Sequence, residues 1–304
     1  MLVDENRRTG TFLLLGSTEF SILQNIRESL TGRMGRIRLY PMNFSEIQGL
    51  DKKISKPTRS QLLKHFEAGG MPGIAFSRDT QVRSDLLQDW IDLTCQRDIF
   101  QFKRLRLDSE LAYALLRNCA TLEEPTGAAL ASATRANPKK VATHIKALIE
   151  LFVLMPLQPH PSGTGKPIFL ILDSGVAAHL GANLMRQFHI SLTVERMSKN
   201  GYSGSKRNSY FYYRSTGKKL IHLVEEELGG QTRAFQIFDR ESVKKTDLEL
   251  LKAFQKKNPT SSPTLLAPIS EGWKEAVVRV LPWEEIYTDI STNSSNQKEK
   301  MSGN

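Results

Sequence analysis

The sequence predicts a mixed α/β protein, and three stretches of its 304 residues carry that prediction. Near the N-terminus, two short apolar runs flank an amphipathic segment within about 30 residues, as in one unit of a parallel sheet. A series of helical segments then ends in two short strands. The last third of the chain returns to strands, with one helix between them.

The N-terminal unit begins with an uninterrupted apolar run at Thr11–Gly16, which predicts a strand that is covered on both faces. The segment Phe20–Leu30 predicts a helix because its apolar residues recur at helical spacing. Arg36–Tyr40 predicts a second strand, which ends at Pro41.

The middle of the chain is predicted to be helical, with segments at 61–68, 83–94, 108–120, 126–134 and 139–151. Gly69, Gly70 and Pro72 end the first helix, and Asn137 with Pro138 can cap and start the last one. Strands at 152–157 and 168–172 flank a loop that is rich in Pro and Gly. A helix pair followed by two strands is the pattern of a winged helix-turn-helix.

The C-terminal part is predicted to be a small mixed α/β domain. Strands are expected at 210–214, 220–224, 234–238, 264–267 and 276–281, with a helix at 246–255. The tail from Thr288 is rich in Ser, Asn and Lys and is predicted to be disordered.

Composition excludes several classes of protein. No apolar run approaches the roughly 18 residues of a membrane span, and the charged N-terminus is not a secretory signal, so we expect no membrane partner. The two cysteines, Cys95 and Cys119, predict reduced thiols in a cytoplasmic protein rather than a disulfide scaffold or a zinc cluster. The histidines lack the spacing of metal ligands, and the formal net charge of +10 permits a polyanionic partner.

Several segments together resemble a prokaryotic family of predicted AAA-type ATPases with a C-terminal domain of unknown function. The end of the family's ATPase core resembles LLLGSTEFSILQNIRESLTGRMGRIRLYPMNFSEI at 13–47. Its C-terminal domain resembles GGMPGIAF, WIDLTCQRDI, ANPKKVATHIKALIELFVL, FLILDSGVAAHL, YFYYRSTGKKLIHLVEE and AFQIFDRES. The resemblance implies that residues 1–50 are the C-terminal fragment of a parallel-sheet ATPase domain and that residues 60–182 form a helical and winged-helix region. It further implies a small α/β domain like a PD-(D/E)xK restriction endonuclease at 183–287, followed by a tail at 288–304.

The chain departs from this family in its nucleotide chemistry. It contains no P-loop of the form G-x-x-x-x-G-K-[ST], and the Gly-rich string 162–167 predicts a hairpin loop. We therefore expect an N-terminally truncated member that needs no cofactor by itself, whereas ATP and Mg²⁺ are implied for full-length relatives. The resemblance leaves Ser17, Thr18 and Arg33 as candidate nucleotide-sensing residues, although Arg33 could instead pair with a carboxylate such as Glu28.

The nuclease-like end also departs from the family. The metal-binding Asp of the family aligns with Ile221, its Glu with Gln236 and its Lys with Phe238. These side chains can neither hold Mg²⁺ nor activate water, so we predict no catalytic residue and no metal site.

Two basic stretches contain no acidic residue. The first, Pro125–Ile149, carries Arg135, Lys139, Lys140 and Lys146 at or near the second helix of the winged-helix pattern, where such proteins meet DNA. Protein docking remains the alternative use of that surface. The second, Arg196–Val224, carries Lys206 and Arg207 in a Gly/Ser loop, followed by aromatic residues that fit an ordinary strand better than a base-stacking platform.

Taken together, the sequence predicts a non-catalytic protein that binds DNA or a protein partner. Two enzymatic alternatives remain open. The chain could be an ATPase subunit that supplies Arg33 in trans to a P-loop partner, or a divergent nuclease with shifted residues.

Overall fold

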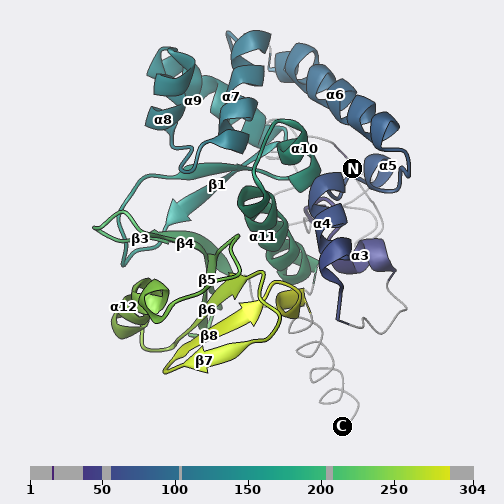
Figure 1. Ribbon diagram of the computed structural model, residues 1–304. Coiled ribbons are helices and arrows are strands. Elements are labelled where there is room, and N and C mark those ends of the chain that lie inside the picture. The colour runs from purple at the N-terminus through teal and green to yellow at the C-terminus, as the bar shows by residue number, and fades with distance from the viewer. Residues whose placement is uncertain (1–15, 17–36, 50–55, 103–104, 203–207, 288–304) are drawn as a thin grey trace, which may run out of the picture.

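The computed structural model describes residues 16, 37–49, 56–102, 105–202 and 208–287, and it has the mixed α/β architecture that the sequence predicts (Figure 1). Most helices gather at one end of the molecule, α12 (Glu249–Lys257) lies at the other end against the sheet, and the strands form one sheet (Figure 1). Except for Gly16, the predicted N-terminal strand and helix lie outside the described residues, as does the predicted tail.

The predicted helices of the middle region and of the C-terminal part are present, and their caps explain where they begin and end. Asn137 accepts a hydrogen bond from the Lys139 amide, Pro138 starts its helix, and Gly69 ends α4 with φ 72°. The helices are α3 (Phe44–Gln48), α4 (Arg59–Ala68), α5 (Pro72–Ala75), α6 (Thr80–Gln96), η2 (Asp98–Gln101), α7 (Ser109–Thr121), α8 (Gly127–Thr134), α9 (Pro138–Glu150), α10 (Ser174–His179), α11 (Leu184–Tyr202), η3 (Lys245–Leu248) and α12 (Glu249–Lys257).

The strands predicted from residue 152 onward are confirmed and lie in an eight-stranded sheet of order β2-β1-β3-β4-β5-β6-β8-β7. The pairs β1–β3, β5–β6 and β6–β8 are parallel and the other neighbours antiparallel. The strands are β1 (Leu154–Pro159), β2 (Ile168–Ile171), β3 (Ser209–Arg214), β4 (Leu220–Glu226), β5 (Thr232–Ile237), β6 (Ser261–Ala267), β7 (Trp273–Glu275) and β8 (Val278–Pro282).

The predicted strand at Arg36–Tyr40 is wrong over its described residues, 37–40, which have no regular structure. Ile37 and Leu39 are 76% and 78% exposed, so their alternation with basic residues does not mark a buried face. The segment is held by side chains instead. The Arg38 guanidinium lies 4.7 Å from the Phe152 ring centroid, and the Tyr40 amide donates to Tyr202 Oη at 2.8 Å.

Helix α11 was not predicted from the sequence. Every residue from Phe188 to Glu195 is buried, because the helix lies between the sheet and helices α4 and α10 (Figure 1). A helix that is buried on all sides has no apolar stripe at a period of 3.6 residues. The helix also contains three buried polar residues, Thr193, Glu195 and Ser198, so its sequence resembles that of an exposed polar segment.

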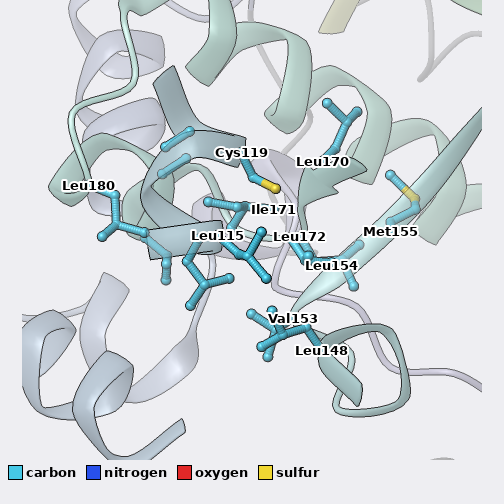
Figure 2. Packing of buried hydrophobic residues seen from close by; sticks show 14 of the residues in the cluster. Leu115, Cys119, Leu148, Val153, Leu154, Met155, Leu170, Ile171, Leu172 and Leu180 are labelled. Carbon is cyan, nitrogen blue, oxygen red and sulfur yellow. The ribbon is translucent and has the colours of Figure 1, made fainter. Parts of the chain in front are cut away.

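The sheet is covered on both faces. On one face Phe188 of α11 packs with Phe235 and Trp283, and on the other Leu251 and Phe254 of α12 pack with the opposite side of β4 and β5. A third core joins α7 and α9 to the β1–β2 hairpin, where Leu115 and Cys119 approach the strand residues (Figure 2). Burying each large apolar side chain contributes about 1.5–3 kcal/mol.

A bulge in β4 changes which residues face α11. Phe211 pairs with Val224 and Tyr213 pairs with Ile221, so one residue of β3 faces both His222 and Leu223 of β4. His222 consequently faces α11, and its ring centroid lies 5.4 Å from that of His189.

Two sequence motifs that are far apart in the chain meet at Asp173. Its carboxylate caps α10 by accepting from the Val176 amide at 2.9 Å, and it also accepts from the Gly70 amide at 2.7 Å. A Cβ on Gly69 would lie 2.2 Å from Asp173 Oδ1, so only glycine fits there. The Gly-Gly and Asp-Ser-Gly motifs therefore join α4 to α10 and hold no free catalytic group.

Candidate nucleic-acid interface

Helix α9 and the turn before it present a group of exposed basic side chains, here called the α9 basic surface: Arg135, Lys139, Lys140 and Lys146. Arg135 ends α8 in the left-handed region, with φ 52°, and so begins the turn toward α9. Lys139 and Lys146 lie seven residues apart on one side of the helix, with Thr143 between them. Lys140 lies on the adjacent side.

The charge of the α9 basic surface is not compensated within the described part of the chain. None of the ion pairs found there involves any of these four residues. The first turn of α9 adds the partial positive charge of a helix N-terminus next to Lys139 and Lys140. This combination favours phosphate groups.

His144 is a structural residue of α9 rather than a contact residue. Its side chain is buried, Nδ1 lies 2.8 Å from the Lys140 carbonyl oxygen, and Nε2 accepts from the Asp108 amide at 2.8 Å. This bond ties the segment before α7 to α9. Exposed Arg106, which is not among the predicted contact residues, therefore lies on a segment anchored to α9. Its signal in the sequence is the basic run at residues 103–106.

The loop between β1 and β2 is a hairpin loop, as predicted, and it is bound to β3. The Thr164 amide donates to the Arg214 carbonyl at 3.0 Å, and Tyr212 Oη donates to the Lys166 carbonyl at 2.7 Å. A Cβ on Gly165 would lie 2.2 Å from Tyr212 Oη, which explains the glycine. The loop is therefore held by the sheet and does not project as a free wing.

An open apolar groove of about 470 Å³ runs beside α9, with Lys146 among its lining residues. The groove is shallow enough to expose aliphatic side chains to solvent and carries no acidic residue. Its other lining residues are Gly127, Ala128, Pro138, Val141, Ala142, Ile145, Ile149 and Phe169.

The second basic stretch does not form a continuous basic surface in its described part. Arg196, which is partly buried, pairs with Glu225, and Arg214 pairs with Glu124 at 3.1 Å. The rings of Tyr212 and Tyr213 are buried, so they pack the core and are closed to nucleic-acid bases. Lys206 and Arg207 lie outside the described residues, as do Ser17, Thr18 and Arg33.

The positions that align with nuclease catalytic residues lie in the core beneath α12. Ile221 is fully buried among apolar side chains, and Phe238 packs against the same cluster. Gln236 is buried, and its Oε1 has no hydrogen-bond partner among the described residues. No group of three or more His, Cys, Asp or Glu side chains able to hold a metal is found in the described ranges.

Neither cysteine is set up as a nucleophile. Cys95 and Cys119 are free and buried, and burial raises the pKa of both thiols to about 12. Both therefore stay protonated near neutral pH and pack as small apolar side chains. Among the described helices, none combines the length and the apolar character that a membrane crossing requires.

Comparison with known proteins gives two similarities. Residues 1–48 match the family described as an AAA domain. An uncharacterised protein of Methanocaldococcus jannaschii is 26% identical over 114 residues, which is 34% of this chain and 25% of that protein. The chain thus matches about a quarter of that relative's length. No solved structure matches. These findings support a relationship to AAA-type proteins.

Proposed function

We propose, from the similarity of residues 1–48 to an AAA domain, that this chain is a non-catalytic AAA-type protein that binds DNA through the α9 basic surface. The observation that carries the proposal is four exposed cationic side chains with no acidic partner among the described residues. Such charges bind the DNA backbone by releasing its counterions, without reading sequence.

The order of α7, α8, α9 and the β1–β2 hairpin supports a winged-helix arrangement in which α9 is the helix that meets DNA. Since the hairpin loop is bonded to β3, α9 and the turn before it would supply the contacts. Contacts to phosphates dominate this surface, so we expect weak sequence preference.

The proposal predicts that the triple variant Lys139→Gln/Lys140→Gln/Lys146→Gln loses at least about tenfold in affinity for a short DNA duplex, because three counterion-releasing contacts disappear. Fluorescence anisotropy with labelled duplex at low salt measures this. The matched control is Lys64→Gln/Lys256→Gln/Lys274→Gln, which removes the same charge from exposed residues elsewhere. We expect the control to bind like the wild-type chain.

A protein partner is the second candidate, and the apolar groove beside α9 favours it. Apolar surface that is open to solvent commonly marks a protein contact. The same pair of triple variants separates the two functions. Equal DNA affinity of both variants would contradict DNA binding at α9 and leave the groove as the functional feature.

A further inference from the structure

A second, polar cavity lies away from the α9 basic surface, between the end of α7, the first turns of α11 and strand β4. It has a volume of about 330 Å³ and is here called the α11 cavity. The polar side chains that line it are those of Thr121, Glu123, Asn183, Arg186, His189 and His222.

Arg186 brings a buried positive charge to the cavity. The residue is 8% exposed, and its Nη2 donates to the main-chain carbonyls of Leu122 and Glu123. No carboxylate forms an ion pair with it within the described residues. Burial lowers the pKa of Arg186, and the nearby Glu123 carboxylate offsets this only in part. The buried cation therefore has no close counterion in the described part of the chain, and its remaining N–H groups can donate to an anion.

His222 adds a neutral donor. Its Nδ1 accepts from the Ile237 amide at 3.0 Å, so the proton of the neutral ring is on Nε2. Burial, and then the nearby Arg186, lower the pKa of His222 to about 3, so the ring stays neutral near pH 7. The bulge in β4 turns this ring toward α11.

His189 supplies the observation that points most directly to a ligand. The residue is 2% exposed and lines the cavity, and its Nε2 has no hydrogen-bond partner among the described residues. An unsatisfied buried polar atom costs about 1–3 kcal/mol unless something binds it. The cavity also lies at the N-terminus of a 19-residue helix, where Met185 is a lining residue.

We propose that the α11 cavity binds a phosphate group, either inorganic phosphate or the phosphate of a small monoester. Arg186 and the His222 Nε2–H would donate to its oxygens, and the helix N-terminus would add partial positive charge. His189 Nε2 would gain its missing partner from a phosphate oxygen or a phosphate hydroxyl. A metal cation fits poorly because the Arg186 charge lines the same space. Glu123 is the one lining carboxylate, and it belongs to an exposed residue.

The test is calorimetric titration of the full chain with inorganic phosphate at constant ionic strength. We expect saturable binding of one phosphate per chain. His222→Asn retains an acceptor for the Ile237 amide, but its shorter side chain cannot place an N–H where the histidine Nε2–H lies, and we expect about tenfold weaker binding. Glu123→Gln changes only an exposed side chain, so folding is preserved, and we expect tighter binding because a repulsive charge is removed.

Two further experiments identify the ligand and distinguish binding at the α11 cavity from binding at the α9 basic surface. Titration with glycerol phosphate and with a nucleoside monophosphate shows whether an ester is preferred over free phosphate, and either preference supports the site. The triple variant Lys139→Gln/Lys140→Gln/Lys146→Gln should bind phosphate as the wild-type chain does. Absence of saturable binding, equal affinity in Glu123→Gln and wild type, or loss of binding only in the triple variant would overturn the proposal.

Discussion

Acidification from about pH 7 to about pH 5 is expected to destabilise the folded chain steeply, because three histidines are buried in their neutral form. Burial lowers the pKa of His65 to about 4 and that of His222 to about 3, and it holds the pKa of His189 well below its usual range. In the unfolded chain each histidine titrates near pH 6.5.

The sign of this effect follows from proton uptake. Below about pH 6.5 the unfolded chain binds protons on these histidines while the folded chain does not, so the free energy of unfolding falls as pH falls. Each proton that only the unfolded chain binds lowers the free energy of unfolding by about 1.4 kcal/mol per pH unit. Three such protons lower it by about 4 kcal/mol per pH unit, until the folded histidines begin to titrate near pH 4. Asp173 acts in the opposite direction, since burial raises its pKa in the folded state.

Urea unfolding at several pH values between about 7.5 and 5 measures this slope. The variant His65→Gln should lose about one third of it, because one of the three groups is removed. A slope below about 1.4 kcal/mol per pH unit throughout the window would correspond to no more than one proton. That result would contradict the burial of three neutral histidines.

The substitution Glu225→Ala is expected to destabilise the fold by about 3–5 kcal/mol, because it leaves the guanidinium of Arg196, whose side chain is only 10% exposed, without its carboxylate. Glu225 is 2% exposed, and its Oε2 accepts from Arg196 Nε at 2.8 Å. Asn208 Nδ2 donates to Oε1 at 2.7 Å, and Arg233 Nη1 lies 3.6 Å from Oε2. The carboxylate thus links β4, β5 and α11 with Asn208, the residue before β3.

Guanidinium unfolding of Glu225→Ala should be compared with that of Glu227→Ala. Glu227 also pairs with Arg233, at 2.7 Å, but it is partly exposed, so its loss should cost at most about 1 kcal/mol. Replacing Glu225 and Arg196 together by Leu and Met should recover much of the loss, since no buried charge remains. Equal costs for the two single substitutions would contradict the role of Glu225 as a buried counterion.

Local sequence signals predict most of the helices and strands. The elements that they do not predict depend on contacts between segments that are far apart in the chain. A helix such as α9 can be predicted from its N-cap Asn137, the proline at its first position and its apolar face. Helix α11 has no such face because neighbours surround it, and the segment 37–40 alternates like a strand without pairing as one. The parallel pairing of β1 with β3, which fixes the hairpin loop, joins segments about 50 residues apart and leaves no local pattern.

Of the two candidate sites, the α9 basic surface could be predicted from local sequence signals and the α11 cavity could not. Exposure of Lys139, Lys140 and Lys146 could be predicted because basic side chains between apolar positions of a helix face solvent. The α11 cavity could not, because Arg186, His189 and His222 come from a helix without amphipathic spacing and from a strand whose bulge reverses one side chain. Burial makes these polar residues unusual, and burial follows only from the assembled fold.

The most direct test of DNA binding through the α9 basic surface is the salt dependence of duplex affinity, measured for the wild-type chain and for both triple lysine variants. A plot of log Kd against log salt concentration has a slope set by the number of phosphates neutralised, about 0.9 for each. We predict that Lys139→Gln/Lys140→Gln/Lys146→Gln lowers that slope by about 2.7, whereas Lys64→Gln/Lys256→Gln/Lys274→Gln leaves it unchanged. Equal slopes for the two triple variants would contradict binding at α9.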